Sequence, residues 1–405
     1  MIPLQEARAF VLDCVAPLGI REVALHDAVG LVLGEDVTST TDVPPFANSA
    51  MDGIAVRAAD TGPGARLRVT STVAAGDPPD ADVDAGEAVR IMTGAPIPAG
   101  ADAVVMVELL SFDGADVVLE RGVEVGTAIR PAGDDLRRGQ VALRAGSVVS
   151  PAVIGVAATV GREELPVFRR ATVGVFSTGD ELVDPGVALL PGQIHDSNRH
   201  ALLALVEDAG CTPVDLGRLA DDEAAIEGAL REATERCDAI VTSGGVSMGE
   251  FDYVKSVLAR IGDMRWMQVA IRPAKPLAVG TIASSTGHPV PVFGLPGNPV
   301  SSHVSFELFA RPALRKMMGH ARLDRRRFTA VLPDGVTRRR DGKVHYDRVG
   351  LDVDGAGRIV AHALAQQGSH HTAAMAAAAG LAEIPDGEGI APGGTVEVLP
   401  LGVEW

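Results

Sequence analysis

Apolar and polar positions along the middle of the chain predict strands and helices in alternation. Residues 171–176, 238–242 and 290–295 are short apolar runs of strand length, and each ends at serine, glycine or proline. Between these runs, residues 198–209 and 222–236 carry leucine, isoleucine or valine at helical spacing. Strands that alternate with helices in this way are typical of a doubly wound α/β domain with a parallel sheet.

The loops that follow the three predicted strands indicate a ligand crevice. In open sheets of this kind, ligands sit outside the carboxyl ends of the strands. We therefore expect hydroxyl groups, glycine backbone and carboxylates to gather at one edge of the sheet. The loop residues are Ser177, Thr178, Gly179, Asp180 and Glu181 after the first strand, Ser243, Gly244, Gly245 and Ser247 after the second, and Pro296, Gly297, Asn298 and Pro299 after the third.

The last of these loops predicts a helix N-terminus beside the end of a strand. Asn298 favours the N-cap position, and Pro299 suits the first helical turn, where its missing N–H costs nothing. Val300, Val304 and Leu308 then continue at helical spacing. Free backbone N–H groups and the helix dipole make such a place suitable for an anion. A well-capped corner without a ligand is the other interpretation of the same residues.

The rest of the chain predicts three further domains. The patterns of residues 1–15 and 26–33 indicate helices, and the small residues 151–159 indicate a third helix that packs back on them. Residues 66–149 and 325–405 alternate short apolar runs with Gly, Pro and Asp turns, which is typical of small β domains. The expected domains are a discontinuous helical domain of residues 1–46 and 136–169, an inserted β domain of residues 47–135, an α/β domain of residues 170–322 and a C-terminal β-barrel-like domain of residues 323–405.

Composition and charge narrow the class of protein. The 405 residues carry 36 Lys and Arg against 53 Asp and Glu, a formal net charge of −17, which disfavours nucleic acid and acidic membranes as partners. The sequence has no apolar run of about 18 residues and no secretory signal pattern, so we expect a cytoplasmic protein. Cys14, Cys211 and Cys237 are odd in number and widely spaced, which argues against a disulfide framework or a cysteine metal site.

Carboxylates near the predicted crevice indicate a divalent cation. Mg²⁺ takes one or two carboxylates plus substrate phosphates, so several acids beside a phosphate-type loop suggest phosphoryl or nucleotidyl chemistry. Each single acid also has a simpler interpretation as a helix N-cap or a surface charge. The acids are Asp180, Glu181, Asp221, Asp222 and Asp252.

Positive charge for an anionic ligand comes from a proline-fixed segment. Arg272 and Lys275 lie three residues apart in R-P-A-K-P, although a solvated surface pair would look the same. His370 and His371 make a poor metal site because adjacent side chains diverge and no third ligand is spaced nearby. No P-loop lysine motif, complete dinucleotide fingerprint or nucleophile elbow follows any predicted strand, so these classes of enzyme are disfavoured.

Five motifs stand out along the chain: P-P-F-A-N-S-A-M-D-G at 44–53, R-I-M-T-G-A-P-I-P at 90–98, F-S-T-G-D-E-L at 176–182, S-G-G-V-S-M-G-E-F-D-Y at 243–253 and G-L-P-G-N-P-V-S at 294–301. Together they resemble those of the molybdopterin molybdenumtransferases, the MoeA and gephyrin-type family. The resemblance implies four domains, an elongated homodimer and a reaction in which adenylylated molybdopterin is cleaved with molybdate. The products would be AMP and active molybdenum cofactor, and Mg²⁺ would assist.

The resemblance also implies roles for individual residues. Taken alone, Asp52 marks a hairpin turn and Thr93 closes a strand, but the motifs suggest that both reach the crevice of the other subunit. Glu181, Asp221 and Asp252 would hold Mg²⁺ or orient the adenylyl phosphate, and these acids together with Asp52, Thr93 and Lys275 are the candidate catalytic residues. The remaining implied substrate-binding residues are Arg272, Pro296, Pro299, Ser301, Arg348 and Ser369, beside the loop residues given above.

The sequence departs from the family pattern in the cation segment. Gln268 and Arg272 stand where the family commonly has lysine, and Ala274 replaces a glycine. An arginine holds an oxyanion with a planar fork and not with a point charge, so the preference for molybdate or tungstate stays open. Two other functions also stay open, a molybdopterin adenylyltransferase and a non-catalytic molybdopterin-binding protein. Expected partners are a second copy of the chain, an adenylyltransferase and recipient molybdoenzymes.

Overall fold

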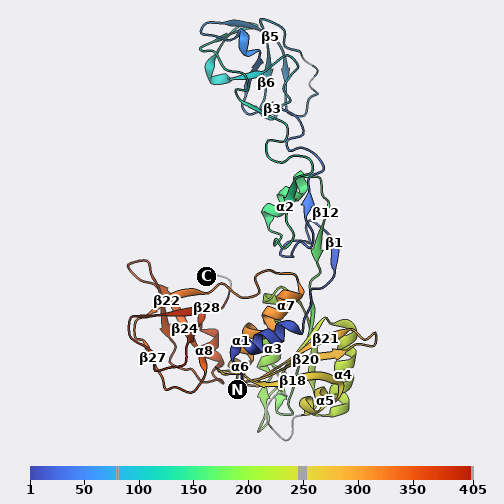
Figure 1. The fold of residues 1–405 in the computed structure, drawn as a ribbon, viewed down its shortest axis with the longest axis vertical. Helices are drawn as coiled ribbons and strands as arrows, with labels where there is room; N and C mark the ends of the chain where they lie inside the picture. Colours follow the sequence, from blue (N-terminus) through green and yellow to red (C-terminus); the bar gives the residue numbers. More distant parts are fainter. Residues whose placement is uncertain (79, 81, 245–252, 403–405) are drawn as a thin grey trace. The chain divides into compact units, whose positions relative to one another are not determined.

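The computed structural model describes residues 1–78, 80, 82–244 and 253–402. The chain forms two compact units. The first unit comprises Met1–Arg21, Gly30–Gly34 and Val167–Trp405, and the second comprises Glu22–Val29 and Glu35–Pro166. The paired strands β1 (Ile20–Ala24) and β12 (Glu164–Phe168) each contain a point where the chain passes from one unit to the other. The architecture is that of a multi-domain α/β protein (Figure 1).

A six-stranded sheet forms the centre of the first unit. Its order is β16-β13-β17-β21-β20-β18, in which the first four strands are parallel and the last two are antiparallel to their neighbours. The three predicted strands are confirmed as β13, β17 and β21, and the other three strands were not predicted. The bounds are β13 Thr172–Thr178, β16 Thr212–Leu219, β17 Ala239–Ser243, β18 Gly262–Gln268, β20 Pro276–Ala283 and β21 Pro289–Leu295.

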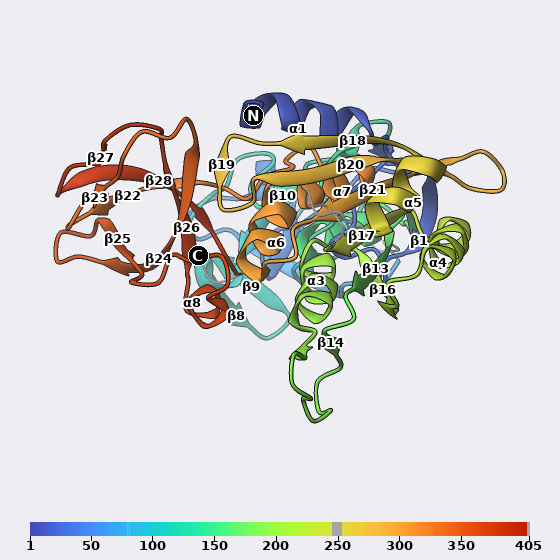
Figure 2. The same cartoon turned by 90° about the horizontal axis from the view of Figure 1, so that it is seen from below.

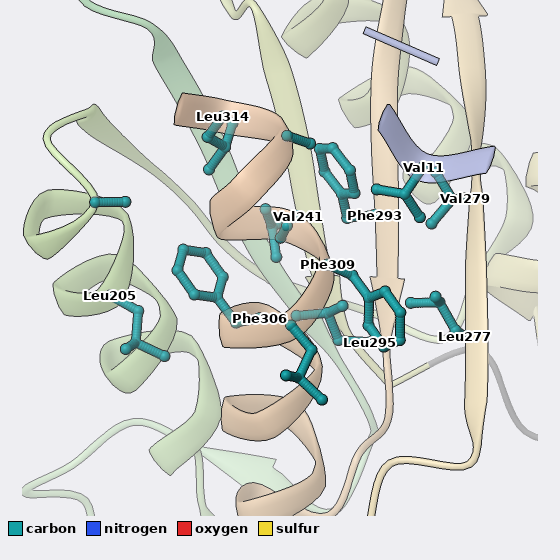
Figure 3. Packing of buried hydrophobic residues seen from close by; sticks show 14 of the residues in the cluster. Val11, Leu205, Val241, Leu277, Val279, Phe293, Leu295, Phe306, Phe309 and Leu314 are labelled. Carbon is teal, nitrogen blue, oxygen red and sulfur yellow. The ribbon is translucent and has the colours of Figure 1, made fainter. Parts of the chain in front are cut away.

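Helices cover both faces of this sheet because its strands are apolar on both sides. Val241 and Phe293 point into one core, whereas their neighbours Ile240 and Val292 point into the other. Figure 3 shows the first core, where Phe309 of the helical layer lies beside Leu295 of β21. The helices of this face are α1 Leu4–Asp13, α3 Ser197–Asp208, α6 Pro299–Ser305, a π-helical turn Phe306–Ala310 and α7 Arg311–Met317; those of the other are α4 Glu223–Arg236 and α5 Tyr253–Ile261.

The C-terminal part of the first unit is a closed β-barrel (Figure 2). Five strands close a ring in the order β24-β25-β22-β28-β26, because β26 also pairs with β24. A short strand from the α/β domain, β19 (Ile271–Arg272), pairs with β24 and attaches the barrel to that domain. The other bounds are β14 Leu182–Val183, β15 Ile194–His195, β22 Phe328–Leu332, β23 Val336–Thr337, β24 Val344–Val353, β25 Ile359–Ala363, α8 Thr372–Ala376, β26 Gly380–Ile384, β27 Gly389–Ile390 and β28 Gly394–Pro400.

In the part that the structure describes, the second unit contains the predicted β module and one α-helix. Its main sheet has the order β7-β4-β6-β5-β9-β8, and Ser150 caps helix α2 (Pro151–Thr159) by accepting a hydrogen bond from the Val153 amide. The other bounds are β2 Val37–Thr38, β3 Asn48–Ser49, β4 Gly53–Val56, β5 Arg66–Val73, β6 Glu87–Ile91, β7 Ala103–Met106, β8 Leu110–Asp113, β9 Asp116–Leu119, β10 Ile129–Arg130 and β11 Val141–Leu143, with 3₁₀ turns Ala58–Asp60 and Val107–Leu109.

Two local predictions near the N-terminus are wrong. Residues 26–33 form turns and not a helix, because Gly30 adopts a left-handed φ of 83° that interrupts helical backbone. The strands on either side of Asp52 do not pair as a hairpin: β3 pairs with β10, and β4 pairs with β6 and β7. Among the helices that the structure describes, none is long and apolar enough to cross a membrane.

Packing in the central core predicts how much the free energy of unfolding falls when one buried side chain is truncated. Phe293 is fully buried on β21, so Phe293→Ala should lower the free energy of unfolding by about 3–5 kcal/mol, measured by urea denaturation. Phe112 in the second unit is 49% exposed, and Phe112→Ala serves as the control, with an expected loss below about 1 kcal/mol. Equal losses in the two variants would contradict this assignment of the core.

Candidate functional site

The predicted crevice is present at the carboxyl ends of the parallel strands. A cavity of about 780 Å³, which we call the main cavity, opens where β13, β17 and β21 end. Its size and mixed lining are those of a small-molecule site. Nine of the predicted residues line the main cavity: Thr178, Gly179, Glu181, Asp221, Ser243, Gly244, Gly297, Asn298 and Pro299.

Gly179 gives the carboxylate of Glu181 its place in the main cavity. Gly179 has φ of 142°, and a Cβ atom added there would lie 2.5 Å from Oε2 of Glu181. Any larger residue would therefore have to push the carboxylate away. The glycine of the S-T-G-D-E motif is needed for this close approach and not only for flexibility.

A second acid shares the cavity with Glu181. Burial raises the pKa of Asp221, and the negative charges of Asp180 and Glu181 raise it further, although the Asp180 amide donates a hydrogen bond to it (3.3 Å). Carboxylates that repel one another in a polar cavity are a suitable donor set for a hard divalent cation, since the cation would remove the repulsion. The residues present therefore fit Mg²⁺. The third predicted ligand, Asp252, lies outside the described residues, as do Gly245 and Ser247.

The first turn of α3 holds two of the cavity loops together. Nδ2 of Asn198 donates one hydrogen bond to Oγ of Ser243, at the end of β17, and one to the carbonyl oxygen of Gly297, both at 2.6 Å. The two loops also approach backbone to backbone, since a Cβ atom on Gly297 would lie 3.8 Å from Cα of Gly244. Asn198 therefore fixes the spacing of the loops at which β17 and β21 end.

The same helix holds the end of the third strand through a buried ion cluster. Ser177, at the end of β13, donates a 2.5 Å hydrogen bond to Asp196, the N-cap residue of α3. Arg199 pairs with Asp196 and with the carboxylates of Asp215 and Asp184. Ser177 is fully buried, so the structure places it beneath the main cavity lining and gives it a structural partner in place of a ligand.

The N-terminus of α6 is less open than the sequence predicts. Asn298 occupies the N-cap position and Pro299 the first turn, as expected, but the Asn298 side chain makes no capping hydrogen bond. The amide of Val300, the first free donor after the proline, donates to the carbonyl oxygen of Ser369 (3.1 Å). This donor holds the barrel loop, so an anion here would depend more on side chains than on the helix terminus.

A second cavity of about 420 Å³, which we call the cation cavity, adjoins the main cavity. Arg272 and Lys275 line it, both are exposed, and neither makes an ion pair with another described residue. A third cation, Lys343 of the barrel, also lines the cavity, but its ammonium group pairs with the carboxylate of Asp341 (3.1 Å). The other predicted residues in its lining are Pro296, Asn298, Ser301 and Ser369.

The geometry of the cation segment explains one departure from the family pattern. Ala274 has φ of 73°, a left-handed backbone that glycine adopts without strain and that costs an alanine about 1 kcal/mol. Ala274 is also 3% exposed and packs in the central core, where its methyl group contributes a similar amount. The alanine is therefore tolerated, and Arg272 and Lys275 keep their places on either side of it.

Arg348 does not line either cavity. Its side chain is fully buried, and burial lowers the pKa of its guanidinium despite the opposing charge of Asp347. Nη2 donates hydrogen bonds to the carbonyl oxygens of Gln366 (2.5 Å) and Gly368 (3.1 Å). The structure thus gives the predicted substrate-binding cation another role, which is to hold the barrel loop that carries Ser369.

Asp52 and Thr93 lie in the second unit and contact each other. The Asp52 carboxylate accepts hydrogen bonds from the backbone amide of Thr93 (2.7 Å) and from its hydroxyl (2.8 Å). These hydrogen bonds lower the pKa of Asp52, so it is ionised at neutral pH. Two motifs that are 41 residues apart in the chain therefore form one exposed acidic group.

Several cavity residues have no functional role in the sequence pattern, among them Asn198, Lys343 and His370. The pattern places Asn198 at the start of a helix and Lys343 in the C-terminal β domain, and it makes His370 a poor metal ligand. His370 lines both cavities, as Asn298 does. One sequence feature could have indicated a role for Asn198, because it lies in the first turn of a helix that must reach the strand ends. No comparable sequence feature indicated a role for Lys343 or His370.

Comparisons with known proteins match every part of the chain. Residues 2–161 match the MoeA N-terminal region (domain I and II), residues 174–316 a probable molybdopterin binding domain, and residues 329–401 the MoeA C-terminal region (domain IV). Molybdopterin molybdenumtransferase 2 of Mycobacterium tuberculosis is 40% identical over 95% of this chain and 96% of its own length. Molybdopterin molybdenumtransferase of Haemophilus influenzae is 36% identical over 91% of each chain. A crystal structure of the molybdopterin biosynthesis MoeA protein from Pyrococcus horikosii has a TM-score of 0.84 and 32% identity, and covers 99% of each chain.

The close approach of Gly179 to the Glu181 carboxylate predicts that a methyl group added at position 179 would weaken Mg²⁺ binding. Gly179→Ala should weaken Mg²⁺ binding, measured by calorimetry, by about tenfold or more, because the added Cβ displaces the carboxylate. Gly186→Ala is the matched control, since Gly186 also has a positive φ (90°) but has nothing within 4 Å of its Cβ position. Equal Mg²⁺ affinity in the two variants would contradict the role of the close approach.

Because Asp221 lies near the negative charges of Asp180 and Glu181, removing its charge should stabilise the fold. The raised pKa of Asp221 means that folding disfavours its ionised form, so Asp221→Asn should raise the Tm at pH 7 without metal by about 1–2 °C. As the pH falls through the raised pKa, the wild-type carboxyl group gains a proton and recovers this stability, so the difference should shrink. Calorimetric scans between pH 3 and pH 8 measure the difference in Tm between the variant and the wild type. A lower Tm of the variant at pH 7 would contradict the claim that the ionised Asp221 destabilises the fold.

Proposed function

Because the chain belongs to the molybdopterin molybdenumtransferase family, we propose that it inserts molybdenum into molybdopterin. It binds adenylylated molybdopterin and molybdate, cleaves the adenylylated compound, and releases AMP and active molybdenum cofactor. One observation supports the proposal most strongly: the main cavity, which contains acids and glycine loops, adjoins the cation cavity. Adenylylated molybdopterin and molybdate differ in chemistry, so a reaction between them requires two adjoining sites of this kind.

The main cavity suits the adenylyl end of the substrate. Glu181 and Asp221 would hold Mg²⁺, which would neutralise charge on the phosphates when bound. Backbone at Gly244 and Gly297 lets phosphate oxygens approach closely, and Asn198 keeps the two loops at a fixed spacing. The chain's own contribution to the cleavage is therefore position and electrostatic stabilisation.

The cation cavity suits molybdate. A chain with a net charge of −17 repels a dianion at long range, so local cations must hold it. Arg272 and Lys275 supply them, and Ser301 and Ser369 lie in the same lining for hydrogen bonds to the oxyanion. The planar fork of Arg272 can bind two oxygens at once, where a lysine would offer a point charge.

The pair formed by Asp52 and Thr93 fits a role at the cavity of a second copy. Its carboxylate is exposed and ionised, and the Thr93 contacts hold it in one orientation. This role requires the homodimer that the family resemblance implies. Both the dimer and the contribution of the second copy are part of the proposal.

Two other functions make different demands on the site. A molybdopterin adenylyltransferase would use ATP and would have no need of the cation cavity, whose lining includes Lys343 and Ser369 of the barrel. A non-catalytic molybdopterin-binding protein would bind the adenylylated compound without releasing AMP. The cation cavity favours the transferase over both.

Release of AMP from adenylylated molybdopterin, with and without molybdate, tests the proposed function. We expect molybdate-dependent release by the wild-type protein with Mg²⁺ and a loss of about 100-fold or more in Glu181→Gln, because the neutral amide cannot serve as the charged ligand. Glu207→Gln, a surface change on α3, is the control and should keep the wild-type rate. Binding without release, or consumption of ATP without molybdate, would select one of the other two functions.

A further inference from the structure

The two cavities share two side chains, Asn298 and His370, which therefore stand at the neck between them. The geometry points to His370 as a substrate-contacting residue that donates a hydrogen bond to the phosphoanhydride bridge of adenylylated molybdopterin. This inference rests on the proposed function, since it assigns AMP to the main cavity and molybdate to the cation cavity. The bridge joins AMP to the group that must meet molybdate, so it passes through the neck.

The loop that carries His370 is built to hold it in one place. From the barrel side, the guanidinium of Arg348 donates hydrogen bonds to the carbonyl oxygens of Gln366 and Gly368. The side-chain amide of Gln367 accepts a hydrogen bond from the Arg348 backbone N–H and donates one to the Arg348 carbonyl oxygen (2.9 Å each). From the α/β side, the Val300 amide binds the carbonyl oxygen of Ser369. Residues directly before His370 are thus fixed to both domains.

Gly368 permits the histidine to fold over this loop. A Cβ atom on Gly368 would lie 3.1 Å from Cε1 of His370 and 3.0 Å from the ring of His371. The two imidazole rings contact each other with centroids 4.1 Å apart. The His370 ring makes no hydrogen bond to another residue that the structure describes, so its N–H is available at the neck.

The chemistry of cleavage favours a donor at this point. Water adds to the phosphorus of the AMP group, the bond from that phosphorus to the bridging oxygen breaks, and the electron pair stays on the bridging oxygen. The products of this step are AMP and molybdopterin, whose own phosphate keeps the former bridging oxygen, and a proton of the water goes to solvent. A donor that faces the bridging oxygen stabilises charge that grows during the reaction, so its loss lowers kcat more than it raises KM.

Three variants test the inference through the intact substrate and its fragments. His370→Ala should reduce kcat for AMP release at least tenfold with a smaller change in KM. His370→Gln keeps an N–H donor and should recover part of the loss. His362→Ala on β25, an exposed histidine of the same barrel outside both cavities, should keep the wild-type values.

Calorimetric binding separates this inference from the proposed function. AMP alone and molybdate alone do not span the neck, so His370→Ala should bind each within about threefold of wild type but bind adenylylated molybdopterin at least fivefold more weakly. If wild-type protein releases no AMP, the proposed function fails, and the binding comparison still decides the contact. Wild-type kcat together with wild-type affinity for the intact compound in His370→Ala would overturn the inference, as would equal weakening of all three ligands.

Discussion

The side-chain amide of Asn198 fixes the edge of the sheet on which the rest of the site depends. Its two hydrogen bonds, to Ser243 and to the Gly297 carbonyl, join the loops after β17 and β21. Asp196, two residues earlier, accepts from Ser177 at the end of β13. One helical turn thus holds the ends of three strands. The hydroxyl groups of Ser177 and Ser243 are buried, and each would cost about 1–3 kcal/mol if it were left without its partner. This turn therefore holds the two glycine loops at a fixed spacing beside the main cavity.

The barrel supplies the second half of the site. The pairing of β19 with β24 places Arg272 beside the barrel, and the hydrogen bond from Val300 to Ser369 brings the barrel loop to the start of α6. The cation cavity is therefore a product of two domains, whereas the acids of the main cavity come from the α/β domain alone. This division matches a reaction that joins an oxyanion to a phosphorylated organic compound.

Most of the α/β domain and many of its site residues could be predicted from local pattern. Strand, glycine loop and helix follow one another closely in the sequence, so Gly179, Glu181 and Gly297 were expected at one edge. Asn198 could not be assigned, because its partners lie 45 and 99 residues away in the chain. The burial of Arg348 could not be predicted for a related reason: a charged residue in a strand gives no sign that it will donate hydrogen bonds to backbone carbonyl oxygens. The short helix expected at residues 26–33 does not form, because Gly30 has a left-handed backbone conformation. The spacing of apolar residues gives no sign of this conformation.

We propose that each reactant has its own cavity and that the two cavities meet at a shared neck. Diffraction from crystals soaked with AMP and tungstate, a heavy analogue of molybdate, tests it directly because the anomalous signal locates the metal. We expect tungsten between Arg272, Lys275 and Ser369, and AMP at the ends of β13, β17 and β21. Tungsten outside the cation cavity, or both ligands in a single cavity, would contradict it.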